Sequence, residues 1–181
     1  IIFDLELRGL CDHKSRRKTF AWLKDLKADS VCLQETFCSA KLQPNFDASW
    51  KGAVYHSLTN SSHSRGVSIL FKENLNVKCI NHHTDENGRM LMVNFELCDL
   101  NEMFSVCSIY APNDENVRAD FFKTLSKWII TNTLNENNTI VSGDFNCCLN
   151  ETDRVPSSHL KDKSRLPFKN LTSTCKLDDM W

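Results

Sequence analysis

Thr139-Ile140-Val141-Ser142-Gly143-Asp144-Phe145-Asn146 is the stretch that decides how this chain is organised. Its apolar start predicts a buried strand that delivers an acid and an amide at its end. In an Asp-x-Asn triplet both side chains can lean to the same side, so Asp144 could take a proton from water while Asn146 holds a phosphate oxygen. The triplet alone also fits an ordinary turn, because Asp and Asn after a Gly are common turn formers.

Three other short apolar runs also end in polar residues. They cover residues 5–10, 31–36 and 108–113, and the last two bring Glu35, Tyr110 and Asn113 to the ends of predicted strands. In a layered α/β protein the ends of neighbouring strands lie side by side, so these groups can converge on one rim. The four runs together therefore favour a site over a set of unrelated turns.

The order of the motifs carries a family resemblance. They are, in sequence, residues 5–10, Leu33-Gln34-Glu35-Thr36, residues 64–71, Asn87-Gly88-Arg89, residues 109–113, and residues 143–150 with Asp153-Arg154. In this order the chain resembles the apurinic-endonuclease-like domain of LINE-type (non-LTR) retrotransposons, within the endonuclease/exonuclease/phosphatase superfamily. The resemblance runs from residue 1 nearly to residue 181.

The resemblance implies a role for each residue of the candidate site. Glu35 would ligate Mg²⁺, with Mn²⁺ as the alternative metal, and a hard carboxylate with waters and a phosphate oxygen suits that ion. Asp144 would orient or deprotonate the attacking water, and Asn146 would hold that water or a phosphate oxygen. Tyr110 would hydrogen-bond the phosphate, and Asn113 would contact the DNA backbone.

The chain departs from the family pattern at two places. Glu6 stands where the family has Asn in Leu-Asn-x-x-Gly-Leu, and a carboxylate cannot donate the hydrogen bonds of an amide. Glu6 is therefore only a secondary candidate for the metal. The chain ends at Trp181 in a segment that resembles the family's Asp-x-Trp, before its closing Ser-Asp-His motif, so we expect the domain 1–181 to lack its last strands.

Each assignment has a structural alternative. Glu35 could cap the following turn, Tyr110 could be a core aromatic with its hydroxyl at the surface, and Asn113 after a proline is a common turn residue. The neighbours Asp153 and Arg154 match the family but are interpreted as structural support.

Composition places the chain in a definite class. With 181 residues and 41% apolar content it can form one domain with a sizeable core. Its nine cysteines are odd in number and form no Cys-x-x-Cys pair, which favours a reduced intracellular protein with buried thiols and makes a zinc site improbable. No apolar run approaches the roughly 18 residues of a membrane span.

Charge gives a weaker signal for nucleic acid. The formal net charge of −1 predicts few phosphate contacts. Two local basic clusters, residues 14–18 and 161–165, could flank a DNA groove, and each also fits a solvated surface.

The periodicity predicts alternating strands and helices with a β-rich middle. Predicted strands are the run 1–7 and residues 30–34, 54–57, 66–71, 77–81, 89–97, 103–110 and a strand from 139; predicted helices are 15–27, 116–131 and 168–175, with a loop at 156–167. The middle strands should pair antiparallel in hairpins. This order predicts an α/β, four-layer sandwich of two facing mixed sheets flanked by helices, the DNase I-like fold of the superfamily.

Three functions are compatible with the sequence. The first is a Mg²⁺-dependent endonuclease that nicks DNA for retrotransposition, in the family fused to a reverse transcriptase and working in the nucleus. The second is a catalytically impaired remnant or host-adopted fragment that binds nucleic acid or a protein, which Glu6 and the missing tail favour. The third, a phosphatase or phosphodiesterase of the same superfamily, fits the motifs less well.

Overall fold

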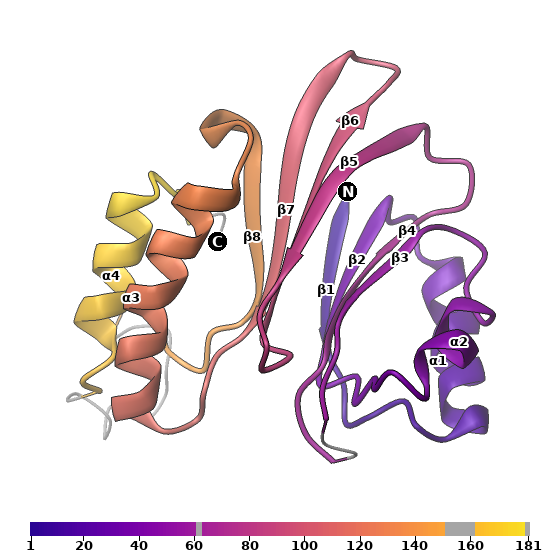
Figure 1. The fold of residues 1–181 in the computed structure, drawn as a ribbon, viewed down its shortest axis with the longest axis horizontal. Coiled ribbons are helices and arrows are strands. Elements are labelled where there is room, and N and C mark those ends of the chain that lie inside the picture. Colours follow the sequence, from indigo (N-terminus) through magenta and orange to yellow (C-terminus); the bar gives the residue numbers. More distant parts are fainter. Residues whose placement is uncertain (61–62, 151–161, 180–181) are drawn as a thin grey trace.

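Two facing β-sheets form the centre of the molecule, and helices cover their outer faces (Figure 1). The computed structural model describes residues 1–60, 63–150 and 162–179. Each sheet has four strands and mixes parallel with antiparallel pairing. The predicted four-layer α/β sandwich is confirmed.

The first sheet is built from the amino-terminal strands in the order β1-β2-β4-β3. Strand β1 (Ile2–Glu6) pairs parallel with β2 (Ser30–Gln34), and the antiparallel pair β4 (Val67–Phe71) and β3 (Val54–Ser57) completes the sheet. The inner strands β2 and β4 are buried along their whole length. Strand β1 is therefore one edge of this sheet.

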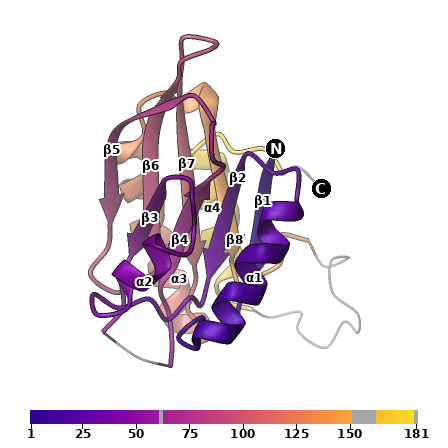
Figure 2. The same cartoon turned by 90° about the vertical axis from the view of Figure 1, so that its right-hand side faces the viewer.

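The second sheet follows in the order β5-β6-β7-β8. Strands β5 (Val77–Thr84), β6 (Met90–Leu97) and β7 (Glu102–Tyr110) form an antiparallel meander, and β8 (Thr139–Asp144) pairs parallel with β7. Strands β8 and β1 are in contact across the two sheets, and Figure 2 shows them on the same side of the molecule. Each sheet thus contributes one parallel pair to the same side of the sandwich.

The helices lie outside the sheets and connect the parallel strands. Helices α1 (His13–Asp25) and α2 (Gln43–Asp47) cover the first sheet, while α3 (Glu115–Asn132) and α4 (Arg165–Thr174) cover the second, as Figures 1 and 2 show. A short 3₁₀ helix, Glu136–Asn138, leads into β8. Helices α1 and α3 are the crossovers that a parallel pair requires.

Alternating strand residues separate three apolar layers. Odd-numbered residues of β2 such as Val31 and Leu33 pack towards α1, whereas Cys32 packs between the sheets. In β7 the pattern is mirrored, because Ile109 packs towards α3 and Tyr110 lies between the sheets. The period of two therefore decides which side chains of the neighbouring strands meet in the middle.

Both crossover helices begin with the same device. Asp12 and Asp114 cap α1 and α3 by accepting from backbone N–H groups of the first turn. Four residues later a buried arginine, Arg16 or Arg118, turns back and donates to carbonyls of the loop that precedes its helix, namely Leu10 and Cys11 or Pro112 and Asn113. The two loops that follow β1 and β7 are thereby fixed.

Several boundaries differ from the sequence prediction. Helix α2 was missed, because its five residues are too few to show a helical period. Helix α4 begins at Arg165, three residues before the predicted start and inside the predicted loop 156–167. Pro167 is tolerated there because the first turn of a helix has no internal partner for its missing N–H. Strand β5 continues to Thr84, beyond the predicted end.

The prediction that all middle strands pair in hairpins is wrong at one connection. Strands β4 and β5 lie in different sheets, so the chain crosses from one sheet to the other between them. In the predicted helix 116–131, Val117 lies at helical spacing with Phe121 and Leu125 and is expected to face inward, but it is 58% exposed, and Arg118 beside it is buried. The buried polar contacts of Arg118 outweigh the apolar pattern at that position.

Two composition-based predictions can be compared with the structure. All nine cysteines are free thiols, and Cys32, Cys38 and Cys107 are buried. Burial raises the pKa of each of these three thiols, which keeps them protonated. Among the described residues, no helix has the length and apolar character needed to cross a membrane.

A buried histidine joins α2 to the first sheet. His56 is 8% exposed, its Nδ1 lies 2.7 Å from Ser68 Oγ, and its Nε2 lies 3.0 Å from Asp47 Oδ1. Burial lowers the pKa of His56 below 6.5, although Asp47 opposes this change. The folded state therefore favours the neutral ring.

We expect His56 to make stability depend on pH. Below pH 6.5 the unfolded chain takes up a proton more readily than the folded one, so stability falls as the pH drops towards the lowered pKa of the folded state. The loss is about 1.4 kcal/mol for each pH unit that separates the two pKa values. His56→Gln should remove this part of the slope. Denaturant unfolding of both proteins at pH 7.5 and pH 5.0 measures it, and equal slopes would contradict the assignment.

Candidate active site

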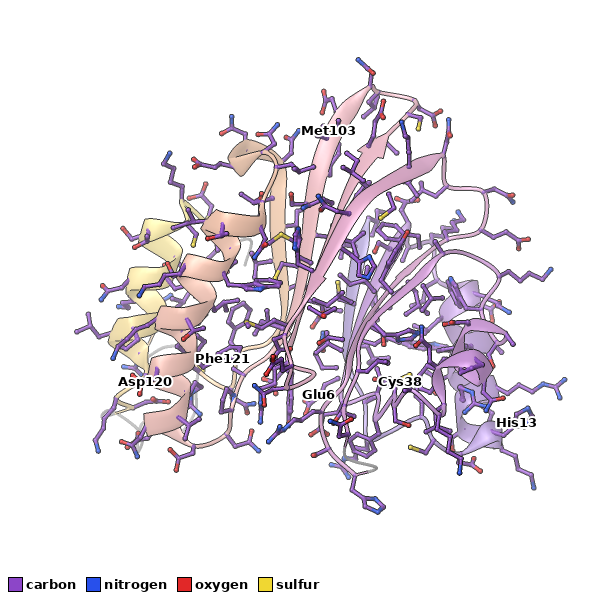
Figure 3. All side chains as sticks on the ribbon, in the orientation of Figure 1. Glu6, His13, Cys38, Met103, Asp120 and Phe121 are labelled. Atoms are coloured by element: carbon purple, nitrogen blue, oxygen red, sulfur yellow. The ribbon has the colours of Figure 1, made fainter. Side chains whose placement is uncertain are left out.

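The carboxyl ends of β1, β2, β7 and β8 meet at one end of the sandwich. In Figure 3 Glu6 marks this end, between the two halves of the molecule, and Met103 marks the opposite end. Glu6, Tyr110 and Asp144 occupy positions whose side chains face the other sheet, and the last two are direct partners in the β7–β8 register. Residues more than 100 positions apart therefore share one rim.

Glu35 reaches this rim through its backbone conformation. It follows Gln34, the last residue of β2, and its φ of 53° breaks the alternation of the strand. The turn is held by Thr36 N–H donating to the Gly66 carbonyl at 3.0 Å. Gly66, with φ of 86°, is required there, because a Cβ would lie 2.7 Å from Thr36 Oγ1.

Tyr110 links the two sheets at the site. Its hydroxyl donates to Glu35 Oε1 at 2.5 Å, and the residue is only 6% exposed. Burial raises the pKa of Tyr110 well above 10, and the charges of Glu35 and Asp144 raise it further. The phenol therefore stays protonated and acts as a hydrogen-bond donor. The alternative of a plain core aromatic does not account for its bond to Glu35.

Asp144 and Asn146 form one unit after β8. The Asn146 amide donates to Asp144 Oδ2 at 2.9 Å and to the Ala111 carbonyl at 3.0 Å, and the Asn146 backbone N–H donates to Asp144 Oδ1 at 2.9 Å. Asn146 has a φ of 51°, which Asn tolerates better than most residues. The predicted leaning of both side chains to one side is confirmed. The amide hydrogens, however, already have partners within the protein.

Gly143 places Asp144 next to β7. Its φ is 136°, and a Cβ at this position would lie 2.1 Å from the carbonyl oxygen of Ile109. Only glycine allows this close approach of the two backbones. The glycine lies within β8, one residue before the strand ends.

Glu6 adds a third carboxylate to the rim. Its pKa is raised by partial loss of solvent and then by the charges of Asp144 and Glu35. Such mutual repulsion favours a bound cation. Among residues 1–60, 63–150 and 162–179, no three His, Cys, Asp or Glu side chains form a ready metal cage. Mg²⁺ is commonly held by one or two carboxylates with waters and phosphate, so Glu35 with Glu6 suits it.

Arg89 lies at the site as well, although its motif Asn87-Gly88-Arg89 predicts no role for it. It stacks over the Tyr110 ring at 5.2 Å and donates to the Tyr110 carbonyl at 2.9 Å. Its backbone is held by Asp85, which accepts from the Arg89 N–H at 2.7 Å. Burial and the neighbouring Arg65 lower the pKa of Arg89. The sequence signal that could have indicated Arg89 is its position directly after the Asn87-Gly88 turn, at the start of a predicted strand.

Asn113 lies at the edge of the site on the loop after β7. The residue is exposed, and its carbonyl accepts from Arg118 Nη1 at 2.6 Å. Arg118 also pairs with Asp162 at 2.6 Å, and Lys163 donates to Asn116 of α3. Described members of the basic cluster 161–165 thus contact the start of α3. Arg16, in cluster 14–18, is buried, and Asp153 and Arg154 lie outside the described residues.

A family model for the endonuclease/exonuclease/phosphatase family matches residues 6–170. The chain belongs to this family. The matched region contains every candidate site residue, from Glu6 to Asn146. The architecture of two facing sheets and the gathered strand ends described above are in keeping with this membership.

One curated relative is a transposon protein. The chain is 29% identical over 150 residues to the transposon TX1 uncharacterized 149 kDa protein of Xenopus laevis. The match covers 82% of this chain and 11% of that protein, so the chain spans only a small part of its relative. This similarity is consistent with the resemblance to LINE-type endonuclease domains.

Solved structures share the fold. An AP endonuclease from Archaeoglobus fulgidus superposes with a TM-score of 0.71 at 18% identity, covering 95% of this chain and 69% of its own. The AP endonuclease of Leishmania major gives 0.67 at 16% identity, with 96% and 66% covered. A mannosyl-6-phosphatase of Bacteroides thetaiotaomicron gives 0.66 at 12%, with 93% and 69% covered. The fold therefore accommodates different phosphate-ester substrates.

We expect Gly143→Ala to destabilise the protein by more than about 1 kcal/mol, because the added methyl meets the Ile109 carbonyl and the φ of 136° disfavours an L residue. Denaturant unfolding measures the loss. Gly52→Ala is not a matched control, since its Cβ also meets backbone; Ser173→Ala, at an exposed position of α4, serves better. Equal stability of Gly143→Ala and the parent protein would contradict the close approach.

Proposed function

We propose that this chain is the nuclease domain of a retroelement protein, a Mg²⁺-dependent DNA endonuclease that hydrolyses a phosphodiester bond and leaves a 3′-hydroxyl. The carrying observation is the convergence of Glu35, Tyr110, Asp144 and Asn146 from both sheets on one rim. Acid, phenol and amide groups in this arrangement suit metal-assisted hydrolysis.

The carboxylates divide the work. Glu35, with Glu6 beside it, would hold the metal, which when bound supplies positive charge to neutralise a phosphate oxygen. Asp144 would take the proton of the attacking water. Asn146 holds both oxygens of Asp144 through its amide and backbone N–H groups, so its first role is to orient that base. Its side-chain oxygen remains suited to accept a hydrogen bond from water.

Two further side chains, Tyr110 and Arg89, would donate hydrogen bonds to the phosphate. Tyr110 stays protonated because of its raised pKa, and its hydroxyl, which donates to Glu35 in this structure, would turn to a non-bridging oxygen once Glu35 holds the metal. Arg89 lies against the Tyr110 ring, and the negative charge of Glu35 acts to raise the pKa of Arg89. This cation is therefore close to the carboxylate that would hold the metal. A fixed arginine stabilises charge that develops on phosphate.

The fold alone does not indicate DNA as the substrate, because it also occurs in a phosphatase. The similarity to a transposon protein is what supports DNA. Asn113, exposed on a loop that Arg118 fixes, is suited to contact a backbone phosphate. A fusion to a reverse transcriptase that extends the nicked end, and work in the nucleus, follow from the same resemblance. Mn²⁺ would substitute for Mg²⁺, because both accept oxygen ligands.

We expect Glu35→Gln and Asp144→Asn each to reduce plasmid nicking by about 100-fold or more, because each removes one negative charge that the chemistry uses. Conversion of supercoiled to open-circular plasmid in the presence of Mg²⁺ measures the rate, and EDTA should abolish it. Glu102→Gln, the same change at the exposed far end of β7, is the matched control and should nick at the parental rate.

Two results would separate the competing functions. Nicking by Glu35→Gln and Asp144→Asn at the parental rate would contradict the proposed active site. A parental protein that binds DNA in a gel-shift assay but does not nick it with Mg²⁺ or Mn²⁺ would instead favour the catalytically impaired binding module.

We expect Asn113→Ala to raise the KM for DNA about 2- to 10-fold with little change in kcat, because one hydrogen bond to a phosphate contributes about 0.5–1.5 kcal/mol. Steady-state nicking over a range of DNA concentrations measures both constants. Asn137→Ala, an exposed asparagine at the other end of the molecule, is the control. A fall in kcat at constant KM would contradict a binding role.

A further inference from the structure

A polar layer lies directly beneath the site, between the two sheets. Asp4 Oδ1 accepts from the Gln34 amide at 2.8 Å and from the Ser142 hydroxyl at 2.8 Å. The same Gln34 amide donates to Ser108 Oγ at 3.1 Å. Asp4 and Gln34 belong to the first sheet and Ser108 and Ser142 to the second, so we call these four residues the polar layer. It joins all four strands that carry the site.

Each member of the polar layer stands next to a residue of the site along its own strand. Ser142 lies two residues before Asp144 and Ser108 lies two before Tyr110, which is the repeat of a strand. Gln34 directly precedes Glu35, whose φ of 53° turns it to the same end. A shift of the polar layer therefore moves the site above it.

Other hydrogen bonds also cross between the sheets, such as Ser57 Oγ donating to Asp85 Oδ1 at 3.0 Å on the side of β3 and β5, but most of the remaining contact is apolar. It consists of residues such as Ile69, Leu91, Val93 and Val106, all buried. Apolar packing is non-directional, so it holds the sheets together without selecting one register. Hydrogen bonds have preferred distances and angles, and the polar layer supplies them on the side where β1 and β8 lie.

The polar layer also carries a cost. Gln34 is fully buried, and within the part of the chain that the structure describes its Oε1 has no hydrogen-bond partner. A buried unsatisfied oxygen costs about 1–3 kcal/mol. Stability alone does not explain an amide at this position, whereas the placement of Glu35 and Asp144 does.

We infer that Asp4 is a positioning residue: by accepting from Gln34 and Ser142 at once, its carboxyl fixes Glu35 of one sheet relative to Tyr110 and Asp144 of the other. This inference rests on the proposed function for its catalytic consequence, but its geometric content is independent of it. Asp4 is exposed on the edge strand β1, and this role needs no contact of its own with the reacting water or the phosphate.

Four variants separate a positioning role of Asp4 from an effect of its charge and from a general loss of stability. Asp4→Ala removes the acceptor, Asp4→Asn keeps an oxygen at the same place, and Ser142→Ala removes one of the two donors while leaving the strand intact. Val93→Ala is the matched control, because Val93 is fully buried between the sheets but away from the polar layer.

In the nicking assay Asp4→Ala should lower kcat about 10- to 100-fold at nearly constant KM, since a displacement of about 1 Å between reacting groups costs that much. Asp4→Asn should restore most of the rate, and Ser142→Ala should give a smaller loss. Val93→Ala should lose stability but keep the parental kcat. A rise in KM at parental kcat, or an equal loss in Val93→Ala, would overturn the positioning role.

A second readout does not need activity. The chain has two tyrosines, so ¹³Cζ-tyrosine NMR in a Tyr55→Phe background shows Tyr110 alone. Its chemical shift reports the hydrogen bond to Glu35, and Glu35→Gln gives the reference for a changed bond. At one fixed pH, Asp4→Ala and Ser142→Ala should move the signal towards that reference, whereas Asp4→Asn and Val93→Ala should not.

The two readouts separate failure of the inference from failure of the proposed function. If the parental protein does not nick DNA, the proposed function fails, and the NMR signal still decides whether Asp4 positions the site. If the Tyr110 signal of both Asp4→Ala and Ser142→Ala stays at the parental value, the inference is overturned even in an active enzyme. Should Asp4→Ala fail to fold, Ser142→Ala alone supplies this comparison.

Discussion

The structure depends on one constraint: the parallel pair β1 and β2 of the first sheet packs against the parallel pair β7 and β8 of the second. Each pair is made by a crossover helix whose start is fixed by an aspartate cap and a buried arginine. Because parallel strands run in the same direction, the carboxyl ends of two strands lie side by side in each sheet. When the sheets stack, these four ends meet, and Glu35 can bond to Tyr110 across the interface.

The same convergence creates an electrostatic problem. Asp4, Glu6, Glu35 and Asp144 gather at one end, and loss of solvent together with mutual repulsion raises the pKa of Asp4 and of Glu6. Hydrogen bonds from Ser142 and Gln34 offset part of this for Asp4, and Arg89 supplies a nearby cation. Gathering negative charge in this way costs stability compared with a neutral rim, because the carboxylates repel one another.

The fold is shared by proteins whose names give different activities. AP endonucleases and a sugar phosphatase have the same architecture at 12% to 18% identity, so the sandwich alone does not select DNA. In the proposed function this selection falls to the loops around the rim, such as the one that carries Asn113 and is fixed by Arg118. The similarity to a transposon protein is the observation on which the proposal of a DNA substrate rests.

The sequence by itself determined the strands, the crossover helices and the residues at the strand ends, because period-two patterns and short polar motifs are local. It thus predicted the sandwich and named Glu35, Tyr110 and Asp144. Tertiary structure alone decided the start of α4, the roles of Arg89 and Gln34, and the contact between Asp4 and Ser142, which are 138 positions apart. Such contacts depend on how one sheet is placed on the other, and no local period records that placement.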